Sequence, residues 1–206
     1  MIFKDREEAG TMLGKALAKY AGMDAVVLAL PRGGIPVAKQ VAQAIGSPLD
    51  LAISRKVGHP MQPEYAIGAV TEDGGVAINE AERANVSEGW LQAEIENQIL
   101  VAKDYRLRYW GSRSRVPIDG KTVILVDDGI ATGYTMLAAI RAIRAQGPTR
   151  IVVAAPVAAP RTRENLCNEA DECVFIDTPA DFRAVGYYYR EFLPVEDEEV
   201  ARLLAA

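Results

Sequence analysis

The chain has 206 residues, of which 50% are hydrophobic and 25% are charged, a balance typical of an ordinary globular protein. Its net charge of −5 and the lack of a Lys- and Arg-rich block argue against binding to nucleic acid or to an anionic membrane surface. The charged start Met1–Arg6 is not followed by an apolar run, and no stretch approaches the roughly 20 apolar residues that cross a bilayer. We therefore expect a cytoplasmic protein.

The first part of the chain predicts helices that alternate with strands. Asp5–Glu8 is typical of a helix N-terminus, and apolar residues recur at helical spacing from there to Tyr20. The continuous apolar run Ala25–Leu30 indicates a strand that is buried on both faces. A helix over Pro36–Ile45 and a strand over Leu49–Ser54 follow.

The middle of the chain is less regular. Arg55–Pro63 is rich in Gly and Pro, and we expect it to form a loop that closes over a ligand. Ala66–Val70 and Val76–Ile78 flank a Gly-containing turn and predict a hairpin. Ser87–Trp110 has an apolar stripe at helical spacing. We interpret it as one long helix packed on the domain, with a lid or a subunit interface as the alternative.

Strands and helices alternate again in the rest of the chain. Strands are expected over Thr122–Val126, Arg150–Ala155 and Cys173–Ile176. Helices are expected after Asp127-Asp128-Gly129 to about Ala145, over Arg161–Glu169 and near Glu198–Leu204. This order predicts an α/β fold, with a parallel twisted sheet and helices on both of its faces, as in Rossmann-like proteins.

The two cysteines, Cys167 and Cys173, lie six positions apart and form no CxxC motif. Because the chain has only one histidine, a metal site built on these cysteines is not indicated. We expect two reduced thiols.

Three loops with unusual composition follow predicted strands: Pro31–Gly34, Arg55–Pro63 and Asp127–Thr135. In open parallel sheets, ligands bind outside the carboxyl ends of the strands. We therefore expect these loops to lie together and to form one anion site.

The loop Asp127–Thr135 is the most informative of the three. Its glycines let the backbone approach a ligand closely, and the helix that follows presents amides with a partial positive charge. Asp127 and Asp128 would repel phosphate, but they suit the vicinal hydroxyls of a sugar or a Mg²⁺ ion. Together these groups fit a ribose 5-phosphate. The alternative is a plain Asp-Asp-Gly turn followed by a Thr helix cap.

The run Val123–Thr135 resembles the 5-phosphoribosyl 1-diphosphate (PRPP) signature of type I phosphoribosyltransferases, which has apolar residues, two acids and a Thr-Gly-x-Thr loop. The resemblance implies that Asp127 and Asp128 bind the ribose. It assigns the 5-phosphate to Gly129, Ile130, Ala131, Thr132, Gly133, Tyr134 and Thr135.

The resemblance extends to the diphosphate side of the ligand. Arg32-Gly33-Gly34 is similar to the loop whose amides and basic residue contact the diphosphate in that family. Arg55 and Lys56 follow the next strand, as basic residues do in several family members, and an exposed basic pair is the alternative. The implied catalytic residues are Arg32, Lys56, Asp127 and Asp128.

The C-terminal segment Pro179–Tyr189 resembles a base-side segment of the hypoxanthine enzymes, in which an aromatic ring stacks on the purine. This likeness points to Phe182 or Tyr187 as the stacking residue, and an ordinary core position is the alternative. Ala131 stands where 6-oxopurine enzymes have an Asp, which disfavours guanine and hypoxanthine as acceptors. The acceptor itself is not identified.

The resemblance implies a transferase that moves ribose 5-phosphate from PRPP to a nitrogenous base or a similar small acceptor and releases diphosphate. Mg²⁺ would bind mainly through PRPP, with Asp127 and Asp128 as additional ligands. A non-catalytic PRPP or nucleotide sensor and an unrelated α/β phosphate-binding enzyme are the alternatives, and Arg32 and Lys56 favour the transferase.

The resemblance also implies a single domain over residues 1–206. We expect a long helical insertion over about 81–115 and a small C-terminal acceptor hood over about 178–206. Because family members are often dimers, a homodimer is a further expectation.

Overall fold

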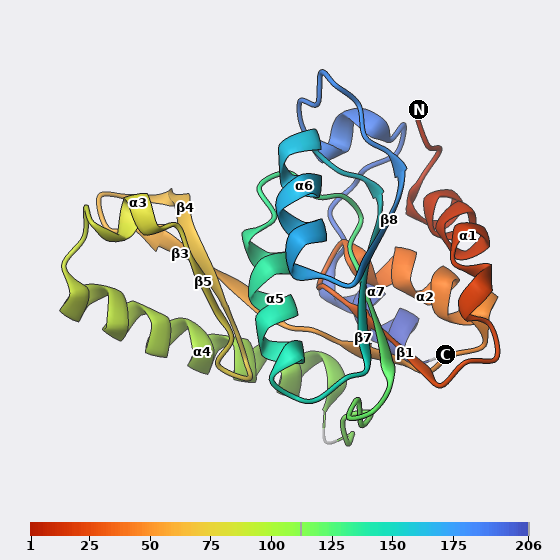
Figure 1. Cartoon of the computed structure of the whole chain (residues 1–206), viewed down its shortest axis with the longest axis horizontal. Coiled ribbons are helices and arrows are strands. Elements are labelled where there is room, and N and C mark those ends of the chain that lie inside the picture. The colour runs from red at the N-terminus through yellow and green to blue at the C-terminus, as the bar shows by residue number, and fades with distance from the viewer. Residues whose placement is uncertain (112, 206) are drawn as a thin grey trace.

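The computed structural model describes residues 1–111 and 113–205, and these residues form two β-sheets (Figure 1). Ser112 and Ala206, which fall in the insertion and hood ranges expected above, lie outside the described residues. The main sheet is entirely parallel, with the strand order β2-β1-β6-β7-β8. Its strands are β1 (Ala25–Ala29), β2 (Leu49–Leu51), β6 (Thr122–Val126), β7 (Arg150–Val157) and β8 (Glu172–Asp177).

Helices cover both faces of the main sheet, which confirms the predicted fold class (Figure 1). One face is covered by α1 (Arg6–Ala16), α2 (Gly34–Ile45) and α7 (Asp197–Ala205), and the other by α5 (Tyr134–Arg144) and α6 (Pro160–Glu169). The short 3₁₀ helices η1 (Ala18–Tyr20) and η2 (Val185–Tyr188) complete these layers.

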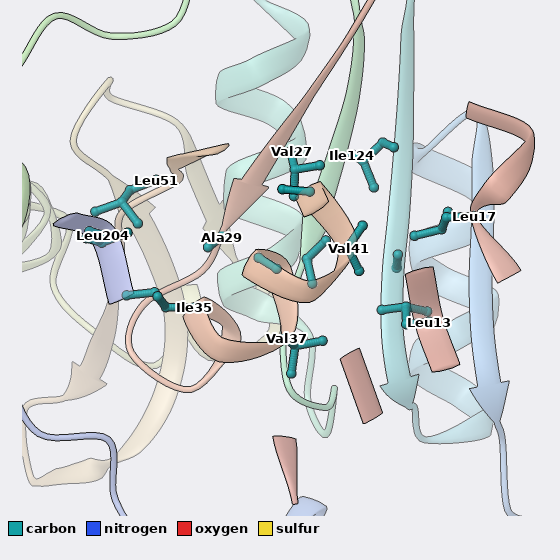
Figure 2. Close-up of a cluster of buried hydrophobic side chains, with 14 of the residues drawn as sticks. Leu13, Leu17, Val27, Ala29, Ile35, Val37, Val41, Leu51, Ile124 and Leu204 are labelled. Carbon is teal, nitrogen blue, oxygen red and sulfur yellow. The ribbon is translucent and has the colours of Figure 1, made fainter. Parts of the chain in front are cut away.

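The first face of the main sheet holds a continuous apolar core (Figure 2). Leu13 of α1 and Val41 of α2 pack there with Val27 and Ile124 of the two central strands. Every residue of β1 is buried, because helices cover both of its faces. This double burial explains why the apolar run in the sequence predicted the strand correctly.

The second sheet is antiparallel and consists of β3 (Ser54–His59), β4 (Gln62–Thr71) and β5 (Val76–Ile78). The hairpin expected between Ala66–Val70 and Val76–Ile78 is confirmed. The expected loop over Arg55–Pro63 was wrong, because this stretch is β3, a tight turn and the start of β4.

Gly58 and Pro63 of that stretch lie within the strands, and Pro60 lies in the turn between them. The pairing of β3 with β4 shifts register on both sides of Gly58. A Cβ atom at Gly58 would lie only 2.3 Å from the Pro63 carbonyl oxygen, so the irregular pairing requires glycine there. Such a bulge has the composition of a loop and the geometry of a strand.

Helices α3 (Glu80–Arg83) and α4 (Glu88–Trp110) follow the second sheet, and the Ser87 side chain caps α4 by accepting from the Trp90 amide. Leu91 of α4 packs on one face of the second sheet. Ala102 and Tyr109, nearer the C-terminal end of α4, belong to the main core. The prediction of a long helix packed on the domain is therefore confirmed.

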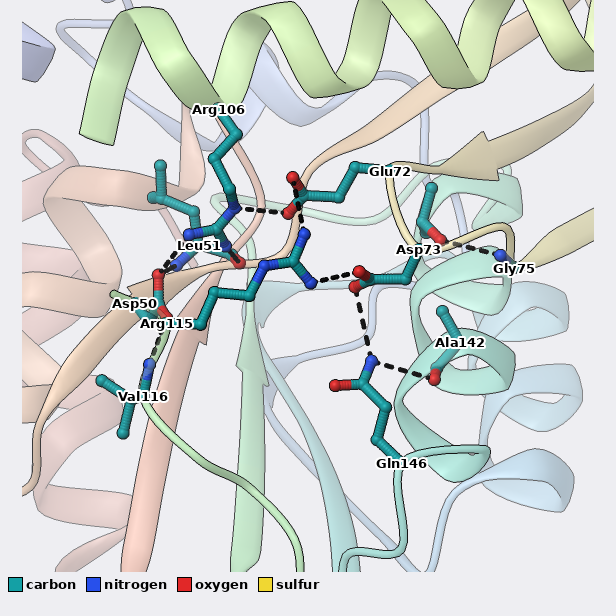
Figure 3. Close-up of polar contacts among 11 residues, drawn as sticks. Asp50, Leu51, Glu72, Asp73, Gly75, Arg106, Arg115, Val116, Ala142 and Gln146 are labelled. Carbon is teal, nitrogen blue, oxygen red and sulfur yellow. Dashed lines mark hydrogen bonds and ion pairs between the residues drawn. The ribbon is translucent and has the colours of Figure 1, made fainter. Parts of the chain in front are cut away.

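A buried ionic network joins α4 to both sheets (Figure 3). Arg106 of α4 donates to Glu72 Oε1 (2.6 Å), to Asp50 Oδ1 (3.0 Å) and to the Leu51 carbonyl oxygen (2.6 Å). The side chains of Asp50 and Glu72 are 3% and 2% exposed. Because a buried carboxylate needs a charged partner, Arg106 fixes where the second sheet meets the main sheet.

The other face of the second sheet packs on α5. Ala69 and Ala77 form a small cluster there with Ala138, and Tyr134 lies against it. A Cβ atom at Gly75 would lie 2.5 Å from the Cβ of Ala142, so the helix and the sheet approach closely. The second sheet is thus fixed to the helix that begins at the predicted phosphate loop.

The expectation of two reduced thiols was wrong, because Cys167 and Cys173 are joined by a disulfide. Cys167 lies on α6 and Cys173 on β8, the adjoining strand, with a Cα–Cα separation of 5.7 Å that a disulfide spans. This pairing depends on how helix and strand pack, and a six-residue spacing does not reveal it. Within residues 1–111 and 113–205, no helix is long and apolar enough to cross a membrane.

Candidate ligand-binding site

Two of the predicted anion loops meet at the carboxyl edge of the main sheet. They follow β1 and β6, which are adjacent parallel strands with Ala29 opposite Val126. A Cβ atom at Gly33 would lie 2.1 Å from Asp128 Oδ2, and one at Gly34 would lie 2.7 Å from the Val126 carbonyl oxygen. The loops are therefore in direct contact, and only glycine fits at these two positions.

The loop after β6 is anchored at its middle. Ile130 donates its amide to the Val157 carbonyl oxygen (2.9 Å), and its own carbonyl accepts from the Ala159 amide (2.9 Å). The Thr162 hydroxyl of α6 donates to the Ala131 carbonyl. Ile130 is 3% exposed and its amide is already bonded, so it anchors the loop and does not present the donor expected of it.

The loop ends at the start of α5, with Gly133 as the N-cap residue. Gly133 has a φ of 77°, and a Cβ atom there would lie 2.5 Å from Thr162 Cγ2. The first amides of a helix have no acceptor within the helix and carry partial positive charge. Thr132 is exposed and Thr135 is half-buried beside these amides. This turn therefore has the donor groups that an anion site needs.

Asp127 and Asp128 begin the same loop, at the end of β6. Asp128 donates its backbone amide to Asp127 Oδ1 (2.8 Å), which fixes the Asp127 carboxylate against the Asp128 backbone. Burial raises the pKa of Asp127 well above its usual range, and the adjacent charge of Asp128 raises it further. Burial also raises the pKa of Asp128, whereas Arg6 acts in the opposite direction. Burial therefore disfavours ionisation of both carboxyl groups, and the charge of Arg6 offsets this effect in part.

Two residues that the sequence did not single out bind Asp128. The Arg6 Nε of α1 donates to Asp128 Oδ2 (2.7 Å), and its guanidinium lies 3.9 Å from the ring centre of Phe192. The Tyr189 hydroxyl donates to the Asp128 backbone oxygen (2.6 Å), and burial raises the pKa of Tyr189. The N-terminal helix and the C-terminal segment therefore both contribute to the wall of the site.

Sequence patterns carry little signal for these two residues. The acids beside Arg6 identify a helix start, and Tyr189 is one of three consecutive tyrosines. Both are brought to the site by the pairing of Phe3 with Tyr189, residues at opposite ends of the chain. Because the paired residues are far apart in the sequence, no local spacing pattern predicts their contact.

Arg32 follows a cis peptide bond with Pro31 and is half-exposed. Its guanidinium faces the start of α7, where it donates to Asp197 Oδ1 (3.3 Å). Its loop contacts Asp128 through Gly33, so the basic side chain lies at the outer rim of the site. Arg32 thus shares this rim with an acid of α7.

Arg55 and Lys56 are separated by the strand that contains them. In β3, Arg55 pairs with Val70 and Lys56 with Ala69, and neighbouring residues of a strand point to opposite faces. Arg55 lies on the α4 side, where it donates to Gln98 Oε1 (3.2 Å). Lys56 shares a face with Ala69, which packs on α5. Of the two, Lys56 is on the side of the phosphate loop.

The predicted stacking residues lie in the segment that crosses the loop after β6. Val185 of this segment packs so closely on Gly129 that a Cβ atom there would lie 2.4 Å from Val185 Cγ1. Phe182 stacks on Tyr188 with ring centres 5.5 Å apart, whereas Tyr187 is 64% exposed. The Arg183 guanidinium lies over the Tyr187 ring, 5.8 Å from its centre, so both predicted stacking residues already have a neighbour on the ring.

Comparison with known proteins agrees with this geometry. The sequence matches the phosphoribosyl transferase domain family over residues 6–191. Two curated relatives from Mycobacterium tuberculosis, strains CDC 1551 / Oshkosh and H37Rv, have provisional phosphoribosyl transferase names and are each 40% identical over 205 residues. The matched region is 98% of this chain and 46% of each relative, so the chain spans about half the length of these curated relatives.

Solved structures give the same result for the fold. The crystal structure of TT1426 from Thermus thermophilus has a TM-score of 0.85 and 43% identity, and the match covers 99% of this chain and 98% of that chain. The purine phosphoribosyltransferase from Pyrococcus horikoshii shares the fold, with a TM-score of 0.51, 18% identity and coverage of 91% and 90%. From its sequence, fold and loop geometry, the chain belongs to the phosphoribosyl transferase domain family.

Proposed function

We propose that the chain transfers ribose 5-phosphate from PRPP to a nitrogenous base or a similar small acceptor and releases diphosphate. One observation carries this proposal. The carboxylates of Asp127 and Asp128 begin the loop that ends at the amides of α5, and Asp128 touches Gly33 of the loop after β1. A phosphate site, a diol site and a second anion loop are therefore contiguous, as a ligand with a phosphate at each end of a ribose requires.

The 5-phosphate would bind the amides and hydroxyls of Ala131–Thr135, with Ile130 and Gly129 setting the path of the loop. The ribose hydroxyls would donate to Asp127 and Asp128. Hydrogen bonds from neutral hydroxyls satisfy carboxylates that the protein leaves partly desolvated.

The diphosphate would lie against the loop after β1. The Gly34 amide already donates to the Leu30 carbonyl oxygen (3.1 Å), so the amides that would face the ligand are those of Arg32 and Gly33. The charged groups would be Arg32 and Lys56, the latter from β3. Arg55, which is bound to α4, would act by supporting the strand that contains Lys56.

Bond cleavage at the anomeric carbon develops positive charge on the ribose and negative charge on the departing diphosphate. The residues named above would hold the donor in one orientation and stabilise the diphosphate as it leaves. Asp127 and Asp128 would fix the ribose through its hydroxyls, and their acidic oxygens would lie near the positive sugar. Binding and orientation, without a nucleophilic side chain, are the chemistry that these residues offer.

Asp127 and Asp128 would bind Mg²⁺ together with oxygens of PRPP, and not by themselves. Carboxylate oxygens of Asp127 and Asp128 are the donors that Mg²⁺ prefers. No group of three acidic, Cys or His side chains able to hold a metal occurs among the residues that the structure describes. Mg²⁺ would therefore bind mainly to PRPP oxygens, with these two carboxylates adjoining, and would neutralise part of the diphosphate charge.

The acceptor would enter beside the segment that contains Phe182 and Tyr187. Tyr187 offers the more accessible ring for stacking. Ala131 in the phosphate loop provides no carboxylate for a purine ring nitrogen, which favours acceptors other than 6-oxopurines.

Release of diphosphate from PRPP and Mg²⁺, measured with a panel of bases, tests the proposal. Release that depends on one acceptor class is the expected result. Tight PRPP binding without release by any acceptor would show a sensor, and absence of PRPP binding would show an unrelated phosphate site. Either of these outcomes contradicts a transferase.

The ribose site has its own test. Asp127→Asn combined with Asp128→Asn should abolish PRPP binding in calorimetry, because each substitution replaces two charged acceptor oxygens by one neutral oxygen and an NH2 donor. The fold should survive, since Asn is nearly isosteric with Asp. Unchanged PRPP affinity in a folded double variant would remove the assignment of these acids.

A further inference from the structure

The side chain of Arg32 is paired with an acid at the start of the C-terminal helix. Arg32 Nη1 lies 3.3 Å from Asp197 Oδ1 and 4.0 Å from Glu196 Oε2. The side chains of Arg32 and Asp197 are 43% and 45% exposed, so the pair sits at the rim of the site in contact with solvent. The cation that the proposed function assigns to diphosphate is thus already beside a carboxylate.

Asp197 is held in place from its other side by α4. The Tyr109 hydroxyl donates to the same Oδ1 atom (2.9 Å), and Arg108 Nη1 lies 3.9 Å from Oδ2. Tyr109 is 8% exposed, and burial followed by the charge of Asp197 raises its pKa to about 12. The tyrosine therefore stays protonated at neutral pH and keeps donating to the carboxylate.

We propose that Asp197 is a positioning residue of the diphosphate side: it holds Arg32 in the ligand-free chain and competes with diphosphate for it. This inference rests on the proposed function. The carboxylate lowers the affinity of the site for PRPP and for diphosphate, and it takes Arg32 back when diphosphate leaves. The binding energy of Arg32 is therefore available to the ligand only in part.

The charges at this rim indicate that Asp197 competes with the ligand for Arg32 and does not assist ligand binding. Glu196, Asp197, Glu198 and Glu199 are consecutive, and only Asp197 is fixed both by a buried hydroxyl and by Arg32. An anion that binds the Arg32 guanidinium must therefore share it with the Asp197 carboxylate or displace that carboxylate. Ion pairs between exposed side chains contribute little to folding, so a role in stability alone gives Asp197 only a small effect.

The test substitutes Asp197→Asn and measures calorimetric affinity for inorganic diphosphate and for PRPP, each with Mg²⁺. Asn keeps an oxygen that accepts from Tyr109 and Arg32, so the substitution removes the charge and leaves the contacts. The dissociation constants of both ligands should fall by about two- to fivefold, the factor that corresponds to an exposed pair. In turnover, the KM for PRPP should fall, and kcat should fall where release of diphosphate limits the rate.

Glu198→Gln is the matched control, because it removes the same charge from an exposed neighbour on the same helix turn. Glu198→Gln should change affinity by less than half as much as Asp197→Asn, because salt in the solvent screens the charge of Glu198. In an Arg32→Met background, Asp197→Asn should have no effect on affinity. Asp197→Ser, which also accepts from Tyr109, provides a second variant, and thermal unfolding checks that each variant folds.

Affinity that is unchanged or weaker in Asp197→Asn would overturn the inference, as would an equal gain in Glu198→Gln. Persistence of the gain without Arg32 would do the same. Damage to the fold cannot mimic the expected result, because damage weakens binding. If the unchanged chain bound neither ligand, the proposed function would fail together with this inference. If only this inference fails, the unchanged chain still binds both ligands, so the two failures are distinguishable.

Discussion

Asp127 and Asp128 illustrate how single residues in this site work against folding. Burial raises the pKa of each carboxyl, so the folded chain resists ionising both. Buried acids with raised pKa values are typical of binding sites, where they lower the stability of the folded chain but are positioned to bind a ligand. Arg6 offsets part of the penalty by pairing with Asp128.

The pH dependence of stability follows from these shifts. The pKa of folded Asp127 lies above the ordinary value of 3.8, so between these two values the folded chain binds more protons than the unfolded chain. The free energy of unfolding must therefore fall as pH rises through this window. The Asp127→Asn variant has no carboxyl group at this position, so its free energy of unfolding should not fall in this way.

We expect Asp127→Asn to match the natural chain in stability near pH 4 and to exceed it at pH 7, because the pKa of folded Asp127 is raised by burial. Urea unfolding at a series of pH values measures the difference. Two stability curves that run parallel from pH 4 to pH 8 would contradict the raised pKa. The same variant should bind PRPP more weakly, so stability and binding change in opposite directions.

Among the elements, the phosphate loop depends on one backbone conformation. Gly133 and Gly22 both have a φ of 77°, but only Gly133 lacks space for a Cβ atom, which would meet Thr162. Gly22→Ala therefore isolates the conformational penalty, about 1–2 kcal/mol for a left-handed residue. Gly133→Ala should lose about 1–3 kcal/mol more through overpacking.

Chemical unfolding of the two glycine variants measures these losses, and calorimetry measures their affinity for PRPP. Only Gly133→Ala should weaken PRPP binding, because it displaces the first amides of α5. Equal effects of the two substitutions on stability and on binding would show that the loop tolerates a Cβ atom.

Arg106 plays the corresponding role for the second sheet. Arg106→Met would remove the cation paired with buried Asp50 and would leave Glu72 with Arg115 alone, and should reduce the free energy of unfolding by about 3–5 kcal/mol. Lys103→Met, an exposed position on the same helix, is the control and should change stability by less than about 0.5 kcal/mol. Similar unfolding midpoints for the two variants would mean that the network does not join the sheets.

Elements buried on both faces were predictable from sequence, and irregular ones were not. The apolar runs at Ala25–Leu30 and Thr122–Val126 identified β1 and β6 because nothing polar fits there. β3 was mistaken for a loop because Gly58 permits a bulge that looks like a turn in composition. The loops after β1 and β6 were placed correctly, since the carboxyl ends of parallel strands share one edge.

At the scale of the whole molecule, the site is assembled from parts that are distant in sequence. Phe3 donates its amide to the Tyr188 carbonyl oxygen (2.8 Å), and this pairing brings α1 and the C-terminal segment together over Asp128. The second sheet reaches the same region through α5. Local patterns could not predict Arg6, Tyr189 or Asp197, because each acts through a contact between remote segments.

The same arrangement places the proposed phosphate loop next to the second sheet. Tyr134 begins α5 and packs against the sheet that contains Lys56. The family fold thus connects the donor site to the elements that would cover it.

A crystal structure with PRPP and Mg²⁺ bound tests the proposed donor site most directly. We predict the 5-phosphate on the amides of Ala131–Thr135, the ribose hydroxyls on Asp127 and Asp128, and the diphosphate beside Arg32 and Gly33. PRPP bound elsewhere, with this loop empty and Arg6 still alone on Asp128, would contradict the proposed site.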